Sequence, residues 1–239
     1  MKDVVKDAVN EVVREDIPAL KQQLADCIRM LERAEIIDFN GHASIRLDDG
    51  RMLINVGNCQ RSKLTAADIC TIDSAGQVVD GTPGKPPLEF HLHAGIYRAR
   101  PALKAVVHAH PKWSTYLTMT GTAYAPVYAQ GSLVYPVPVL DSPDSINNTR
   151  MADRLAATLG DRPAALMKSH GAVTVGHSLV EAFVLAVYME ENAQRQYMAM
   201  QIGTPYHFDE RELALCREKL WSPALFQRAW DHYKAKLDA

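Results

Sequence analysis

Hydrophobic side chains recur along the chain with two different periods. Residues 18–35 place apolar side chains four, four and three positions apart, which predicts an amphipathic helix with Pro18 in its first turn. Residues 42–56 instead contain two short alternating runs on either side of Asp48-Asp49-Gly50, a pattern typical of a β-hairpin. The chain therefore combines helix and strand from its first third onward.

Helices and strands are predicted over the rest of the chain as well. Helices are predicted over 88–100, 113–119, 148–159 and 178–200, with one or two more around Pro223, and strands over 67–72, 76–79, 103–110, 164–170 and 172–176. Residues 122–140 are expected to be strand and loop. Residues 81–87, GTPGKPP, contain too many prolines and glycines for regular structure. Strands framed by helices indicate an α/β protein, a layered sandwich around a mixed sheet.

Composition narrows the class of protein. The 239 residues carry 26 Lys and Arg against 28 Asp and Glu, so no basic surface favours nucleic acid. No apolar run approaches the length of a membrane span, and the charged N-terminus is unlike a signal peptide. The four cysteines have no paired spacing, which favours free thiols in a cytoplasmic protein. We expect one domain over 1–239, with an N-terminal helical extension over about 1–16 and a C-terminal helical tail over about 206–239.

Two histidines stand out at the end of a predicted strand. In AVVHAHPKWS, residues 105–114, His108 and His110 are two positions apart, so their side chains point to one face. His170 ends another predicted strand, and Glu89 opens the helix that precedes the first one. A His-x-His pair is more often a surface or core pair than a site. Three imidazoles and a carboxylate together, however, are ligands suited to a catalytic Zn²⁺, and equally to Mn²⁺, Co²⁺ or Fe²⁺.

Two longer segments carry a family resemblance. PPLEFHLHAGIYRARPALKAVVHAHPKWS, residues 86–114, and KSHGAVTVGHSLVEAF, residues 168–183, resemble the class II aldolase/adducin family, and the likeness runs from about residue 18 to 205. The family includes fuculose-phosphate aldolase, ribulose-phosphate 4-epimerase and several decarboxylases. The resemblance implies a three-layer α/β/α sandwich with a mixed, mainly antiparallel sheet. It also implies a homotetramer whose metal site lies near a subunit boundary.

The resemblance assigns roles position by position. His108, His110 and His170 match the family's metal ligands, and Glu89 matches an acid/base that can also bind the metal. One divalent ion per subunit is implied, with zinc as the first choice and manganese, cobalt or iron as alternatives. His93 matches a recurring histidine for which we predict a structural role. The aldolases also use a tyrosine from a neighbouring subunit, for which Tyr128 and Gln130 are the nearest candidates here.

The sequence departs from the aldolases where they bind phosphate. Asn55-Val56-Gly57-Asn58 replaces a phosphate-binding loop, Pro87-Leu88 replaces a pair of serines, and His42 replaces an asparagine. A phosphate dianion needs several converging donors, and most of them are gone. We therefore expect an unphosphorylated small-molecule substrate. It should be a hydroxy or oxo carboxylate, and an aromatic acid is one candidate. Its candidate contacts are His42, Ser44, Asn58, Arg61 and His91.

Structural alternatives remain for some of these contacts. His42 and Ser44 equally suit a hydrogen-bonded turn between two strands, and Arg61 equally suits a solvated loop charge. The expected reaction is decarboxylation through a metal-stabilised enolate, in which a metal acts as Lewis acid and Glu89 moves a proton. An aldolase acting on a hydroxy-oxo acid or a sugar, a non-haem iron oxygenase, and a non-catalytic module like adducin are the alternatives.

Overall fold

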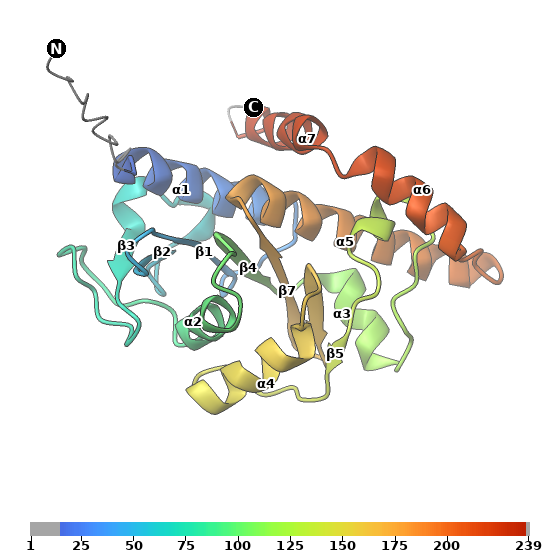
Figure 1. Ribbon diagram of the computed structural model, residues 1–239, viewed down its shortest axis with the longest axis horizontal. Coiled ribbons are helices and arrows are strands. Elements are labelled where there is room, and N and C mark those ends of the chain that lie inside the picture. The colour runs from blue at the N-terminus through green and yellow to red at the C-terminus, as the bar shows by residue number, and fades with distance from the viewer. Residues whose placement is uncertain (1–14, 238–239) are drawn as a thin grey trace, which may run out of the picture.

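The computed structural model describes residues 15–237 (Figure 1). The helices are α1 (Ile17–Arg33), α2 (Phe90–Ala99), α3 (Lys112–Met119), α4 (Thr149–Leu159), α5 (Leu179–Ile202), α6 (Glu210–Leu220) and α7 (Pro223–Ala235). The strands are β1 (His42–Arg46), β2 (Met52–Asn55), β3 (Ile69–Ile72), β4 (Ala105–Ala109), β5 (Val139–Leu140), β6 (Ala164–Met167) and β7 (Gly171–Gly176). Three short 3₁₀ helices, η1 (Arg61–Lys63), η2 (Ala66–Asp68) and η3 (Ala129–Leu133), complete the elements.

The strands form one sheet in the order β3-β2-β1-β4-β7-β6-β5. Every neighbouring pair is antiparallel except β5 and β6, which are parallel, so the expected mixed and mainly antiparallel sheet is confirmed. The central strand β4 pairs with β1 on one side and β7 on the other, and His42 lies opposite His108 across the first of these pairs. The middle of the sheet thus brings together segments more than sixty residues apart.

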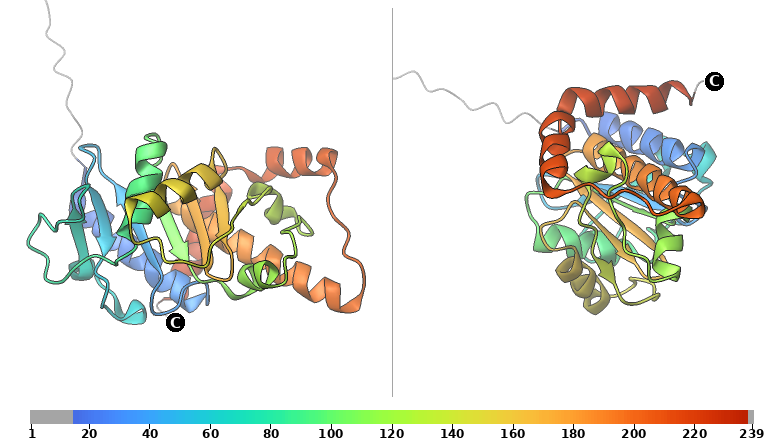
Figure 2. Two further views of the ribbon diagram at one scale, coloured as in Figure 1. Left: turned by 90° about the horizontal axis from the view of Figure 1, so that it is seen from below. Right: turned by 90° about the vertical axis from the view of Figure 1, so that its right-hand side faces the viewer.

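Helices cover both faces of the sheet. Alternate side chains of the strands enter two separate cores, because successive residues of a strand point to opposite faces. One core joins the sheet to α1, α5 and α7, and the other joins it to α2 and α4. Figure 2 shows the same division, with α1 (blue), α5 (orange) and α7 (red) on one side and α2 (blue-green) and α4 (yellow) on the other. The three-layer sandwich predicted from the sequence is confirmed.

Local signals explain where the helices begin and end. The Asp16 side chain accepts a hydrogen bond from Ala19 N at the start of α1, and Asn148 caps α4 in the same way. Gly160, with a φ of 55°, ends α4. At the C-terminus, α6 and α7 flank Ser222, and Trp230 of α7 packs edge-on against Phe183 of α5. The two-helix alternative for this segment is the one observed.

Two details differ from the expectations. Residues 76–79 form no strand and contribute only an isolated bridge between Val78 and Ile72, because Asp73 turns the chain by accepting hydrogen bonds from Ala75 N and Gln77 N. The strand expected over 164–170 ends at Met167, and a turn carries His170. The N-terminal extension falls largely on residues 1–14, which lie outside the described residues. Within 15–237, no helix is both long and apolar enough to cross a membrane.

Candidate metal and substrate site

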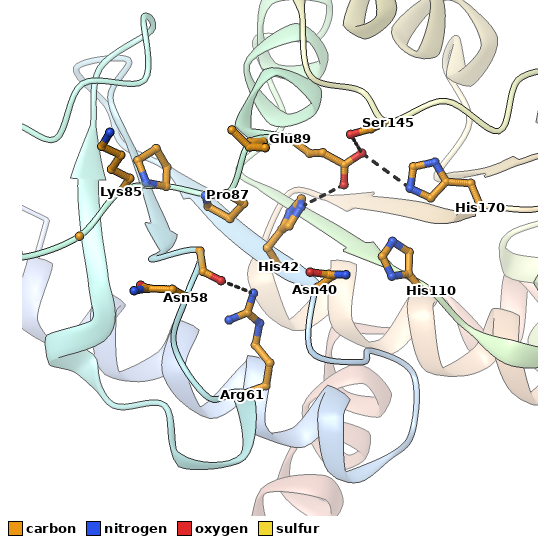
Figure 3. Close-up of a pocket in the computed structure, with 14 residues that line it drawn as sticks. Asn40, His42, Asn58, Arg61, Lys85, Pro87, Glu89, His110, Ser145 and His170 are labelled. Atoms are coloured by element: carbon orange, nitrogen blue, oxygen red, sulfur yellow. Dashed lines mark hydrogen bonds and ion pairs between the residues drawn. The ribbon is translucent and has the colours of Figure 1, made fainter.

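Four side chains able to bind a metal converge at one end of the central strands, and Figure 3 shows Glu89, His110 and His170 of this set. His108 is buried in β4, and His110 lies two residues further along, directly after the strand. His170 directly precedes β7, the antiparallel neighbour of β4. Glu89 is the N-cap residue of α2. One ligand atom from each of the four lies within 4.8 Å of all the others. The predicted set is therefore brought together from three segments of the chain.

Hydrogen bonds orient each of the three rings. Nδ1 of His108 lies 3.0 Å from the carbonyl oxygen of Ala172, and Nδ1 of His170 lies 3.1 Å from that of Asp144. Nδ1 of His110 lies 3.1 Å from a carboxylate oxygen of Asp38. Because these oxygens only accept, each Nδ1 carries the proton and Nε2 keeps its lone pair.

The remaining nitrogens are free for a ligand. Nε2 of His108 and Nε2 of His110 are buried and have no hydrogen-bond partner among residues 15–237. Buried polar atoms without partners are costly and rare in folded proteins. A metal ion bound by these two nitrogens, His170 and Glu89 would satisfy them, and imidazoles held through Nδ1 are the usual form of metal-binding histidine. The residues present thus fit one divalent cation.

The backbone around His170 and Gly171 explains how the ligands approach one another. Ser169 adopts a φ of 53°, in the left-handed region, and its N–H donates to Thr118 Oγ1 at 2.9 Å. A Cβ at Gly171 would lie 2.3 Å from the carbonyl oxygen of Ala109 and 2.9 Å from the His110 ring. Only glycine lets β7 pass this close to the end of β4.

Glu89 is held by contacts on both carboxylate oxygens. Oε1 accepts from Ser145 Oγ at 2.9 Å and from Ile146 N at 2.8 Å, while Oε2 lies 3.3 Å from His108 Nε2 and 3.7 Å from His42 Nε2. Burial raises the pKa of this carboxyl, but the contacts with His42 and the Ile146 N–H, and with His108 when that ring is protonated, outweigh burial and hold it well below the usual range. Glu89 is therefore a carboxylate, the form that binds a cation or accepts a proton.

A cavity of about 670 Å³ opens beside these ligands. It is lined by Asn40, His42, Gly57, Asn58, Arg61, Gly84, Lys85, Pro86, Pro87, Leu88, Glu89, His110, Ser145 and His170. The proline-rich segment 81–88 forms one wall and is tied to the opposite loop by a hydrogen bond from Gly57 N to the Lys85 carbonyl oxygen. Glu89 is the only carboxylate in the lining, whereas Arg61 and Lys85 are cations, so the cavity suits an anionic ligand.

Arg61 is not the solvated loop charge that one alternative described. Its side chain is 4% exposed, and its guanidinium donates to the carbonyl oxygens of Gly41, Cys59 and Gly57. No carboxylate within residues 15–237 forms an ion pair with it. A buried cation at a cavity wall, compensated only by carbonyl dipoles, favours an anion beside it.

The other predicted contacts divide into two groups. His42 and Asn58 line the cavity, whereas Ser44, His91 and Tyr128 do not. Ser44 is fully buried in β1, behind His42, so the predicted substrate contact is not available to it in this arrangement. Neither His42 nor Ser44 sits in a turn between strands, because both belong to β1 itself.

His91 and Tyr128 point elsewhere. The His91 ring packs against Phe90, 4.1 Å between centroids. Tyr128 lies beside η3 under the guanidinium of Arg195 and does not line the cavity. His93 is fully buried and bonded to side chains of β1, in line with the structural role expected for it.

Three residues at the site escaped the sequence analysis. Asp38 orients His110, Ser145 donates to Glu89, and Lys85 lines the cavity. Asp38 and Ser145 lie in loops without periodicity, 72 and 56 positions from their partners. Lys85 sits in a segment that could be recognised only as irregular. No local pattern signals such contacts.

Comparison with known proteins agrees with the site. A model of the class II aldolase and adducin N-terminal domain matches residues 22–197. The 3,4-dihydroxyphthalate decarboxylase of Terrabacter is 32% identical over 77% of this chain and 82% of its own length. The 5-methylthioribulose-1-phosphate/5-deoxyribulose-1-phosphate aldolase of Rhodospirillum rubrum is 30% identical over 75% and 80%.

A solved structure shares the fold across nearly the whole chain. The aldolase II superfamily protein from Pseudomonas syringae covers 96% of both chains with a TM-score of 0.84 at 22% identity. The named relatives are lyases, which agrees with an enzyme built around a cation site. On the match to the family model and the identity to its members, this chain belongs to the class II aldolase and adducin family.

Proposed function

We propose that this protein is a divalent-metal-dependent carbon–carbon lyase that decarboxylates an unphosphorylated hydroxy or oxo carboxylate. The observation that carries the proposal is the set of buried, partnerless imidazole nitrogens of His108 and His110 beside His170 and a carboxylate. Zinc suits three nitrogens and one oxygen, and manganese, cobalt or iron would also be accepted. The bound ion would supply a Lewis acid that spreads negative charge developing on substrate oxygens.

The cavity lining supports a carboxylate rather than a sugar phosphate. Pro87 and Leu88 stand where the aldolases have hydroxyl side chains, and Ser145, the only hydroxyl in the lining, is already bonded to Glu89. The buried guanidinium of Arg61 forms no ion pair with a carboxylate of residues 15–237 and would pair with one on the substrate. The substrate named for the Terrabacter relative, 3,4-dihydroxyphthalate, is an aromatic compound with hydroxyl and carboxylate groups.

Glu89 would serve first as base and then as acid. As a carboxylate that lines the cavity, it can take a proton from a substrate hydroxyl. The bond to the departing CO₂ then breaks, and its electron pair stays on the substrate carbon. Glu89 returns its proton to that carbon, and solvent replaces the proton of the hydroxyl. Ser145 and Ile146 N hold Oε1, so only Oε2 is free to move the proton.

The oligomeric state of the protein is also part of the proposal. The family resemblance implies a homotetramer, and in that state Tyr128 of one subunit would face the cavity of the next. Decarboxylation leaves no aldehyde oxygen to protonate, so Tyr128→Phe should leave turnover within about threefold, whereas an aldolase that uses this hydroxyl should lose about a hundredfold. Native mass spectrometry measures the subunit number independently.

The proposal is tested by metal analysis together with a product screen. The purified protein is assayed for bound metal and then offered hydroxybenzoates, dihydroxyphthalates, hydroxy-oxo acids and unphosphorylated ketoses. We expect about one divalent ion per chain and metal-dependent release of CO₂. Aldehyde release without CO₂ would make it an aldolase, oxygen uptake would make it an oxygenase, and absence of metal and turnover would leave an adducin-like module. His177→Ala, an exposed histidine outside the site, is the control for His108→Ala.

A further inference from the structure

A chain of buried hydrogen bonds runs away from the cavity behind His42. Nδ1 of His42 lies 2.7 Å from Nε2 of His93, and Nδ1 of His93 lies 2.7 Å from Ser44 Oγ. Ser44 Oγ lies 2.7 Å from the hydroxyl of Tyr97. Strand β1 supplies two of these side chains and helix α2 the other two, one helical turn apart. All four residues are at most 5% exposed, so water does not compete for these contacts.

Each contact in this series of hydrogen bonds holds one proton, and the charge of Glu89 determines which partner donates it. Only one N–H can lie between the two rings, because each nitrogen there either donates or accepts. If His42 donated to His93, the lone pair on His42 Nε2 would face the carboxylate of Glu89 at 3.7 Å. If His93 donates instead, His42 Nε2 carries a proton and turns it toward that carboxylate. The second arrangement is electrostatically favoured.

The far end of the chain accommodates the same direction. When His93 donates through Nε2, its Nδ1 must accept, and the hydroxyl of Ser44 can donate to it. Ser44 Oγ then accepts from the Tyr97 hydroxyl, which also lies 3.1 Å from the carbonyl oxygen of Ser44. Each of these three contacts then has one donor and one acceptor, and every donor points toward the cavity.

We propose that His93 is a positioning residue which, with Ser44 and Tyr97 behind it, holds His42 as the tautomer protonated on Nε2. His42 therefore presents a fixed N–H donor to Glu89 and to the cavity, and acts neither as a metal ligand nor as a base. The donor keeps Glu89 Oε2 in place as proton acceptor, which is the part of the inference that rests on the proposed function.

The direct test reads the tautomer. Histidine is labelled with ¹⁵N in the full chain loaded with Zn²⁺, which is diamagnetic, and the His42 signals are assigned by their loss in His42→Gln. We expect the shifts of a neutral ring protonated on Nε2. Protonation on Nδ1, or on both nitrogens, would overturn the inference. This readout needs no turnover, so it fails or succeeds separately from the proposed lyase activity.

A matched pair of variants tests the consequence. In His93→Gln the side-chain amide can place an N–H near the position of Nε2, whereas His93→Leu fills the space without a donor. We expect kcat to fall about tenfold to a hundredfold in His93→Leu, since His42 no longer holds its N–H toward the Glu89 carboxylate, and to stay within about threefold in His93→Gln. Metal content and KM should not change. Equal kcat values for the two variants would overturn the role of His93.

A smaller change guards against misfolding of the leucine variant. Ser44→Ala removes only the hydroxyl that donates to His93, and Ser44→Thr restores a hydroxyl at the same place. The His42 tautomer should become mixed in Ser44→Ala and return to the Nε2–H form in Ser44→Thr. An unchanged His42 spectrum in Ser44→Ala would show that the chain behind His93 does not set the tautomer.

Discussion

The two groups of histidines at this site have the same side chain but opposite hydrogen-bonding states. His108 and His110 each use one nitrogen on a protein oxygen, and the other is buried without a hydrogen-bond partner among residues 15–237. His42 and His93 instead bond to each other through ring nitrogens, and His93 also bonds to Ser44. The first group is prepared for a cation and the second for neutral hydrogen bonding. The difference is set by the partner of Nδ1, a carbonyl or carboxylate oxygen in one case and a ring nitrogen or hydroxyl in the other.

The largest effect should come from removing a free nitrogen. His108→Ala takes one ligand from the center of the set, so metal content should fall to background and activity at least about a thousandfold, because a Lewis-acid metal contributes several kcal/mol. Elemental analysis and the CO₂ assay measure the two together. Full turnover in a metal-free variant would contradict the division between the two groups.

The next effect separates proton transfer from metal binding. Glu89→Gln keeps the shape of the side chain and its contact with Ser145 but removes the basic oxygen, so turnover should fall about a hundredfold or more. Metal content should drop far less than in His108→Ala, because three imidazoles remain. If Glu89→Gln keeps its turnover, another residue moves the proton.

A weaker effect on metal binding is expected when the carboxylate that orients His110 is removed. Asp38→Ala leaves Nδ1 of His110 without its partner, and loss of such a contact lowers metal affinity about tenfold to a hundredfold. Competition with a chromogenic chelator measures the affinity. Asp153→Ala, an exposed carboxylate on α4, should leave it unchanged. Equal affinities in the two variants would mean that His110 does not depend on Asp38 for its orientation.

The smallest effect concerns stability and pH. Burial holds the pKa of His93 well below its usual range, so the native protein keeps this ring neutral while the unfolded chain binds a proton below about pH 6.5. The free energy of unfolding should therefore fall as the pH falls below that value. In His93→Gln this fall should be shallower by up to about 1.4 kcal/mol per pH unit.

Urea denaturation at pH 7 and at pH 5 measures the difference. His177→Gln, an exposed histidine, should follow the original protein. A His93→Gln curve that keeps the full pH dependence would show that His93 is not a buried neutral ring.

The sequence allowed the cation ligands to be predicted better than their surroundings. His108 and His110 share a face because they are two residues apart on one strand, and such spacing is visible without a structure. The contact between His42 and His93 joins residues 51 positions apart, and it depends on how β1 lies beside α2. Arg61 looked like a solvated charge because its partners are backbone carbonyls, which leave no trace in side-chain composition.

The segment 81–88 carries one more consequence. It forms a wall of the cavity, yet it belongs to no strand or helix and is held to its neighbour through main-chain atoms of Gly57 and Lys85. The three histidines of the candidate cation site, in contrast, are anchored at the ends of β4 and β7. Under the proposed function, the wall that contacts the organic molecule and the imidazoles that hold the ion would belong to different pieces of chain. Exchanging this loop should redirect the protein to differently shaped acids while its sheet stays intact.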